Sequence, residues 1–266
     1  MYSTTYHRAS SIDEATALFG KSKEASYLAG GHTLIPVMKQ RLASPSDVID
    51  IGTIKELVGI ETSADAVTVK AATPHYDVAI SEAVRKGIPA LAHLASVIGD
   101  PAVRYRGTIG GSLANNDPAA DYPAAVLALG ATIKTNKRSI AADDYFRGLF
   151  ATALGEGELI IAVSFPLPAK AGYAKFPQPA SRFALTGVFV ARTKSGDVRA
   201  AATGASQNGV MRLPAIEAAL KANWWPAALD SVRISADGLM SDIHGSSDYR
   251  ANLIKVMAQR AVQQSG

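Results

Sequence analysis

Two pairs of adjacent glycines stand where this chain could hold a phosphorylated ligand. One lies in Ala29-Gly30-Gly31-His32-Thr33-Leu34 and the other in Thr108-Ile109-Gly110-Gly111-Ser112. Glycine permits positive φ and lets a ligand approach bare backbone N–H groups, so such a loop can bind a diphosphate without Lys or Arg. Taken alone, such a pair is more typical of a simple turn. Two such segments in one chain favour a single long dinucleotide held by both.

The second glycine segment continues into polar residues and then a helix. Asn115 and Asp121 follow the glycines, and an apolar run from Ala124 to Leu129 comes next. Asp121 stands where a helix N-cap is expected, whether or not the glycines bind a ligand.

Four segments together resemble one family. The two glycine segments are accompanied by Ile98-Gly99-Asp100-Pro101-Ala102-Val103-Arg104-Tyr105-Arg106-Gly107 and by Asp248-Tyr249-Arg250. In order and spacing they resemble the flavin subunit, or medium subunit, of the molybdenum hydroxylases, the family of xanthine dehydrogenase and carbon monoxide dehydrogenase. The likeness covers essentially the whole chain.

The resemblance implies a function within a complex. A large subunit would carry the molybdenum cofactor, a small subunit would carry [2Fe-2S] clusters, and this chain would bind FAD without a covalent link. Electrons would pass from the iron–sulfur clusters to FAD and then to an external acceptor such as NAD, a quinone or oxygen. The family also implies a dimer of heterotrimers.

The same resemblance assigns a set of cofactor-binding residues and no catalytic or metal-binding ones. The set consists of Ala29, Gly30, Gly31, His32, Thr33, Leu34, Ile98, Thr108, Gly110, Gly111, Ser112, Asn115, Asp121, Ile160 and Lys175. Asp121 matches a carboxylate that accepts from a ribityl or ribose hydroxyl. Ile98 would lie against the flavin, and Ile160 or Leu159 would cover the adenine or a ring edge, with core packing as the alternative for each. The family lysine aligns near Pro177, so Lys175 either replaces it or is a solvated charge.

Composition excludes several other classes of protein. The 266 residues contain no cysteine, so an iron–sulfur cluster or a disulfide cannot belong to this chain. The net charge of +4 is dispersed, which argues against nucleic acid as a partner. No apolar run approaches the roughly 18 to 20 residues of a membrane span, and the first residues lack an apolar signal segment, so we expect a cytoplasmic protein. Neither H-E-x-x-H nor G-x-S-x-G occurs, so neither motif of hydrolytic chemistry is present.

The elements that must position these residues indicate an α+β fold. By the same resemblance, residues 1–168 are expected to form an FAD-binding domain of the PCMH (vanillyl-alcohol oxidase-like) type, in two α/β subdomains of about 1–53 and 54–168. The first begins as a βαβαβ-like unit and lacks G-x-G-x-x-G, which argues against a Rossmann half. The resemblance also implies that residues 169–266 form a C-terminal domain of the carbon monoxide dehydrogenase flavoprotein type. There, a hairpin over 183–192 and 198–203 and helices over 213–221 and 249–262 predict a sheet with helices on one face.

Two other functions fit the same residues. A self-contained flavin oxidase or reductase of this fold would need its own substrate pocket and acid/base residues, and the sequence offers no such group. A non-catalytic assembly module would use the glycine pairs only as turns.

Overall fold

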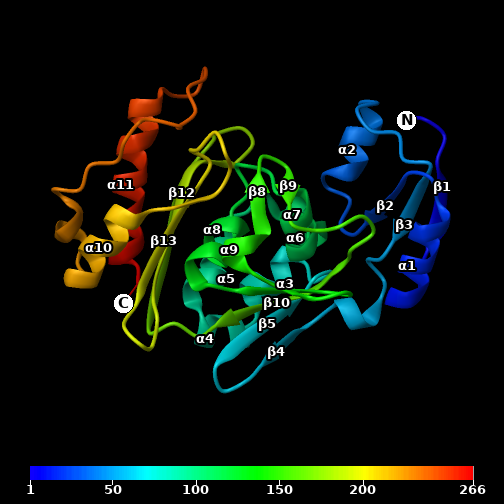
Figure 1. Cartoon of the computed structure of the whole chain (residues 1–266), viewed down its shortest axis with the longest axis horizontal. Helices are drawn as coiled ribbons and strands as arrows, with labels where there is room; N and C mark the ends of the chain where they lie inside the picture. Colours follow the sequence, from blue (N-terminus) through cyan, green and yellow to red (C-terminus); the bar gives the residue numbers. More distant parts are fainter. Residues whose placement is uncertain (266) are drawn as a thin grey trace.

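The computed structural model describes residues 1–265 and contains both helices and sheets, as the sequence predicts. Three sheets of at least three strands follow one another along the chain, and a fourth, of two strands, lies within the segment of the second (Figure 1). Each lies within one of the three predicted segments, although the exact domain boundaries stay a prediction.

The first sheet is small and parallel, in agreement with the predicted βαβαβ-like unit. Its strands are β1 (Thr5–Arg8), β2 (Ala25–Leu28) and β3 (Asp47–Asp50), in the order β1-β3-β2. Helices α1 (Ile12–Lys21) and α2 (Leu34–Lys39) connect them. The first glycine segment is the loop between β2 and α2, so the end of a paired strand fixes its position.

The second sheet is antiparallel. Its order is β4 (Ile60–Thr62), β5 (Ala66–Lys70), β10 (Ile160–Pro166), β6 (Thr132–Thr135) and β7 (Ser139–Ala141). Six helices lie between β5 and β6 in the sequence: α3 (His75–Ile80), α4 (Glu82–Gly87), α5 (Pro89–Ser96), α6 (Pro101–Arg106), α7 (Ile109–Asn115) and α8 (Tyr122–Leu129). Helix α9 (Ala142–Tyr145) then leads into a hairpin of β8 (Phe146–Gly148) and β9 (Ala151–Thr152).

The third sheet is antiparallel too. Its order is β11 (Lys170–Pro177), β12 (Ala184–Arg192), β13 (Val198–Thr203) and β14 (Met211–Arg212). Helices α10 (Pro214–Ala222) and α11 (Ser247–Gln263) follow it.

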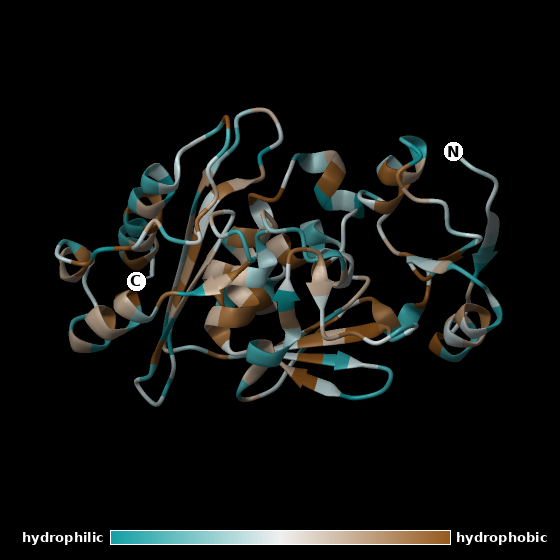
Figure 2. Cartoon of the chain, turned by 45° about the horizontal axis from the view of Figure 1, so that its top comes forward, coloured by the Kyte–Doolittle hydropathy of each residue, from teal (hydrophilic) through white to brown (hydrophobic). Residues whose placement is uncertain are grey.

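Within residues 169–265, α10 and α11 lie on one face of the third sheet, as predicted, and α8 from the preceding segment covers the other face. Alternate residues of β12 divide between two cores: Phe189 packs into a cluster that contains α8, while Val188 and Val190 pack into a cluster with α10 and α11. All eight residues of α8 are buried, because this helix lies between the second and third sheets. Figure 2 shows hydrophobic residues gathered in these central helices and strands.

Helices occupy both segments that the resemblance places around the second glycine pair. Residues 101–106 form α6, and the second glycine pair lies inside α7 with ordinary negative φ angles; of the four paired glycines, only Gly31 has a positive φ, at 76°. The prediction of a second glycine loop was therefore wrong. Among residues 1–265, no helix combines the length and hydrophobicity that crossing a membrane requires.

Candidate functional site

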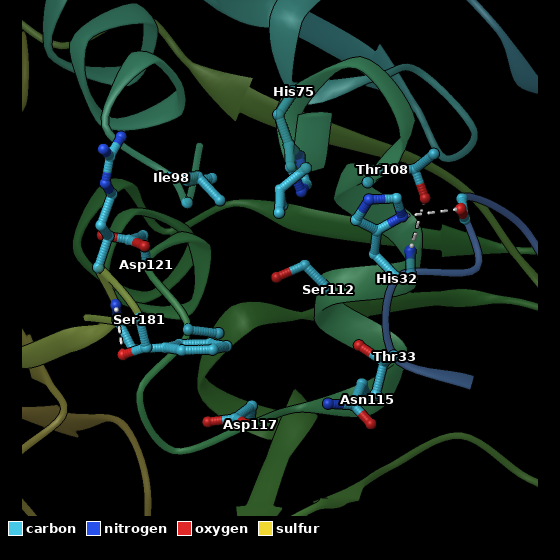
Figure 3. Close-up of a pocket in the computed structure, with 18 of the residues that line it drawn as sticks. His32, Thr33, His75, Ile98, Thr108, Ser112, Asn115, Asp117, Asp121 and Ser181 are labelled. Carbon is cyan, nitrogen blue, oxygen red and sulfur yellow. Dashed lines mark hydrogen bonds between the residues drawn. The ribbon is translucent and has the colours of Figure 1, made fainter. Parts of the chain in front are cut away.

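The two glycine segments converge on one cavity, to which the loop between β11 and β12 contributes the opposite wall (Figure 3). Its volume is about 200 Å³. It is lined by Gly30, Gly31, His32, Thr33, His75, Ile98, Gly99, Val103, Gly107, Thr108, Gly111, Ser112, Asn115, Asp117, Ala120, Asp121, Ser181, Arg182 and Phe183.

Direct backbone contact holds the first loop against the approach to α7. A Cβ added to Gly30 would lie 2.0 Å from the Arg106 carbonyl oxygen and 2.9 Å from the Gly107 Cα. Only glycine allows these two backbone segments to lie this close. The convergence that a shared dinucleotide requires is therefore built into the backbone.

The N-terminus of α7 uses its own N–H groups within the protein. Thr108 Oγ1 accepts from Gly111 N at 3.2 Å, and the Ala71 carbonyl accepts from Gly110 N at 2.8 Å. Ser112 N donates to the Thr108 carbonyl at 3.0 Å. The expectation that bare N–H groups of Gly110 and Gly111 face the ligand was therefore wrong. Gly110 instead allows close packing, since an added Cβ would lie 2.6 Å from that of Ala71.

The first loop has the free donors that α7 lacks. Gly31 and Thr33 accept, through their carbonyls, from Ile35 and Val37 in α2. Within residues 1–265, the backbone N–H groups of Gly31, His32 and Thr33 have no hydrogen-bond partner, and Thr33 makes no side-chain cap. Consecutive free N–H groups at a positive-φ glycine are a typical anion-binding arrangement.

Polar side chains surround these donors. Figure 3 shows His32, Thr33, Ser112 and Asn115 directed toward the same space. His32 is exposed, and its Nδ1 lies 3.3 Å from the Gly30 carbonyl oxygen, so the imidazole makes a local hydrogen bond. Hydroxyl and carboxamide groups can both donate and accept, which suits the mixed polar groups of a nucleotide.

His75 is a cavity residue that the sequence did not single out. Its side chain is only 5% exposed, and its Nδ1 is buried without a hydrogen-bond partner. Burial lowers the pKa of His75 to about 3, with smaller contributions from His32 and Arg104, so the ring is neutral at physiological pH. A neutral imidazole has one donor and one acceptor to offer.

Asp121 forms a buried group with two residues of β11. Lys175 Nζ lies 2.9 Å from its Oδ1, and the Tyr173 hydroxyl donates to the same oxygen at 2.5 Å. Burial raises the pKa of Asp121, and both partners oppose that rise by stabilising the carboxylate. Asp121 makes no side-chain cap for α8, so the predicted capping bond is absent. With 6% of its side chain exposed, Lys175 is not a solvated charge.

Most of the predicted site residues line the cavity, and five do not. The lining includes Gly30, Gly31, His32, Thr33, Ile98, Thr108, Gly111, Ser112, Asn115 and Asp121, but not Ala29, Leu34, Gly110, Ile160 or Lys175. Ile160 is 3% exposed and packs in the core of the second sheet. Lys175 reaches the site only through its ion pair with Asp121.

The sequence reasoning assigned no role to nine lining residues. Gly99, Val103 and Gly107 belong to the segment that supported the resemblance, so the sequence contained evidence that they lie near the site. No sequence pattern pointed to Ser181, Arg182 and Phe183, because no local feature shows that the loop between β11 and β12 folds back over the cavity. The remaining three are His75, Asp117 and Ala120.

These residues suit an FAD molecule. The first loop offers N–H donors for a diphosphate, hydroxyl and carboxylate groups are available for ribityl or ribose hydroxyls, and Ile98, Val103 and Phe183 supply apolar surface for a flat ring. Buried His75 Nδ1 is a polar atom that still lacks a partner. Among residues 1–265, no three or more His, Asp or Glu side chains gather as a metal would require.

Comparisons with known proteins agree with this site. A profile of the FAD binding domain in molybdopterin dehydrogenase matches residues 2–168. The carbon monoxide dehydrogenase medium chain of Afipia carboxidovorans is 36% identical, over 98% of this chain and 96% of that protein. The nicotine 6-hydroxylase medium subunit of Paenarthrobacter nicotinovorans is 34% identical, over 98% and 96%.

Solved structures share the fold as well as the sequence. Carbon monoxide dehydrogenase from Oligotropha carboxidovorans, in reconstituted form, superimposes with a TM-score of 0.90 at 32% identity, covering 99% of this chain and 98% of that one. Quinoline 2-oxidoreductase from Pseudomonas putida 86 gives a TM-score of 0.87 at 28% identity, covering 98% and 96%. The chain therefore belongs to the molybdopterin dehydrogenase family, as an FAD subunit of molybdenum hydroxylase-type complexes.

Proposed function

We propose that this chain is the electron-transfer subunit of its complex, taking electrons from iron–sulfur clusters of a small subunit and passing them to an external acceptor. The substrate would be oxidised at a molybdenum cofactor in a large subunit. When bound, FAD supplies the two-electron carrier that no side chain of this protein can provide.

The observation that carries this proposal is the convergence of two glycine segments, 80 residues apart, on a single cavity. Gly30 and Gly31 come from one, Gly111 and Ser112 from the other, and all four line the same space. If the first glycine pair served only as a turn, its unpartnered N–H groups would not need to face the Ser112 hydroxyl on α7.

Each part of the site would have its own task. The N–H groups of Gly31, His32 and Thr33 would bind the diphosphate, with the Thr33 and Ser112 hydroxyls adding hydrogen bonds. Asp121, held in place by Tyr173 and Lys175, would accept from a ribityl or ribose hydroxyl. Ile98 and Phe183 would pack against the ring and keep water from it.

The division of labour among subunits rests on composition and on the names of relatives. The chain has no cysteine to ligate a cluster. Its relatives are called medium chains or FAD subunits of dehydrogenases, which implies at least one further kind of subunit. We extend this to a dimer of heterotrimers.

Two measurements test the proposal. The purified chain or complex should absorb at about 450 nm, as flavin does. Denaturing the protein, which breaks no covalent bond, should release the flavin and so show that it is not covalently linked. Co-purification of the tagged chain should recover one cysteine-rich and one molybdenum-containing subunit. Flavin absorbance without partners would instead support a self-contained oxidase or reductase, and no flavin at all would support an assembly module.

A further inference from the structure

A second cavity, of about 570 Å³, lies directly beside the first. It is bounded by α5, α6, β11 and α11, and it shares Gly99 and Arg182 with the first cavity. Lys175, whose ammonium pairs with Asp121 in the first cavity, lines the second. A molecule held here would therefore adjoin the site proposed for the cofactor.

The lining of this second cavity is cationic. It contains Arg104, Lys175, Arg182 and Arg260, and no carboxylate. Arg104 Nη1 also donates to the carbonyls of Ile98 and Gly99, and burial lowers the pKa of His93, which favours its neutral ring. Lys175 is neutralised by Asp121, but within residues 1–265 none of the three arginines forms an ion pair. Asp100 lies outside the lining, and its pKa is lowered chiefly by the Val103 N–H and to a smaller extent by Arg182 and Arg104.

Arg182 is held in an unusual conformation at the boundary of the two cavities. Its φ is +61°, in the left-handed region that arginine rarely adopts. Two hydrogen bonds hold the backbone of Arg182 in this conformation. Arg182 N donates to the Gln178 carbonyl at 2.8 Å, and the Arg182 carbonyl accepts from Lys175 Nζ at 2.9 Å. Strain of this kind, sustained by surrounding bonds, is found where a residue must be presented in one position.

We propose that this cavity binds a multiply charged anion and is the site of an anionic electron acceptor. The proposal rests on the proposed function, because it places the acceptor next to bound FAD. Guanidinium groups recognise phosphate and carboxylate through paired N–H donors. Val97, Ala174 and Pro177 add apolar surface, so the ligand is an organic molecule carrying phosphate or carboxylate groups rather than a bare ion.

Arg260 is the residue to change, because it lines only the second cavity and lies on α11, away from the cofactor-binding segments. In the flavin-loaded complex, binding of inorganic pyrophosphate should be measured by calorimetry. Arg260→Gln should weaken it about tenfold, as expected when a charge is lost from a cation-lined site, while Arg260→Lys should retain most of it. Lys255→Gln, an equal loss of charge on the same helix outside the cavity, is the control and should leave binding unchanged.

A kinetic measurement identifies the anion as an acceptor. After stoichiometric reduction of the complex, reoxidation by ferricyanide, a trianion, should be about tenfold slower in Arg260→Gln at low ionic strength, and the difference should shrink in high salt. Reoxidation by neutral 1,4-benzoquinone should change less than about twofold, since charge steering does not act on it.

Several results would overturn the proposal. These are equal pyrophosphate binding by wild type and Arg260→Gln, equal slowing of both acceptors, or loss of flavin from Arg260→Gln, which would mean that the cavity holds part of the cofactor. Absence of flavin from the wild-type complex would instead refute the proposed function itself.

Discussion

Asp121 shows how a single buried charge can couple the cofactor site to the third sheet. Its carboxylate is 4% exposed, and the ammonium of Lys175 is its ion-pair partner. Removing one member of a buried pair leaves the other charged and unsolvated. We therefore expect Asp121→Asn to lower the free energy of unfolding by about 3 kcal/mol, measured by urea denaturation of the flavin-free protein.

The double variant Asp121→Asn/Lys175→Met provides the control. Because it removes both charges, it should recover much of the stability lost in the single variant. Simple addition of the two single losses would show that the ion pair contributes nothing of its own. Flavin retention should fall in both variants, since each removes the carboxylate proposed to accept a hydroxyl.

Gly110 and Gly111 are neighbours with different roles, so an alanine substitution should have a different effect at each. An added Cβ at Gly110 would lie 2.6 Å from the Ala71 Cβ and 2.7 Å from its carbonyl oxygen. At Gly111 it would meet only Thr108 Oγ1, at 3.0 Å, and would project toward the cavity. Gly110 is thus required for packing and Gly111 for access.

Gly110→Ala should destabilise the protein by about 1 to 3 kcal/mol through overpacking. Gly111→Ala should leave stability unchanged or raise it by up to about 1 kcal/mol, because alanine favours a helix, yet it should lower flavin content. Thermal unfolding of flavin-free protein and absorbance per chain are the two measurements. Equal loss of stability in both variants would contradict this division.

At the scale of elements, regular segments were predicted well and the helices around the site were not. The hairpin predicted over 183–192 and 198–203 is observed at Ala184–Arg192 and Val198–Thr203, because its sequence has local strand character. Helix α7 was missed because two glycines disfavour a helix, and tertiary contacts with Ala71 outweigh that preference. Helix α6 did carry a signal: Asp100 Oδ1 accepts from Val103 N at 3.0 Å and Pro101 follows, a typical helix start.

Glu158 fastens the turn between β6 and β7 to the segment that leads into β10. Its carboxylate accepts from Arg138 Nε and Nη2, both at 3.0 Å, from Thr135 Oγ1 at 2.7 Å and from Gly155 N at 2.8 Å. These bonds, the Arg138 contact first among them, lower the pKa of Glu158 to about 2. A folded-state pKa below the unfolded one adds stability at higher pH that is lost as the pH falls.

The loss should appear between about pH 4.5 and pH 2, and a shift of this size corresponds to about 3 kcal/mol. Glu158→Gln should be less stable than wild type at pH 7, and the difference between the two should shrink as the pH approaches 2. Urea denaturation across this range is the measurement. A constant difference at all pH values would show that the ionised carboxylate is not what stabilises the turn.

At the scale of the whole molecule, the cavity is a joint product of all three sheets. Gly31 follows a strand of the first, Ser112 lies on a helix of the second, and Phe183 precedes a strand of the third. The sequence predicted the first two contributions from their motifs. It could not predict the third, because that contribution depends on α8 packing between two sheets, a relation with no local pattern.

Thr203, in β13, joins the third sheet to the cavity wall. Its side chain is fully buried, and its hydroxyl lies 2.6 Å from the Ala120 carbonyl oxygen and 3.0 Å from that of Pro118. Because Ala120 precedes Asp121, this bond sets the position of the carboxylate. Thr203→Val keeps the shape but leaves a buried carbonyl unsatisfied, which should cost about 1 to 3 kcal/mol of stability and weaken flavin binding. Thr203→Ser retains the hydroxyl and should bind flavin nearly as well as wild type, whereas equal flavin loss in both variants would mean that the lost methyl contacts, and not the hydrogen bond, hold the wall.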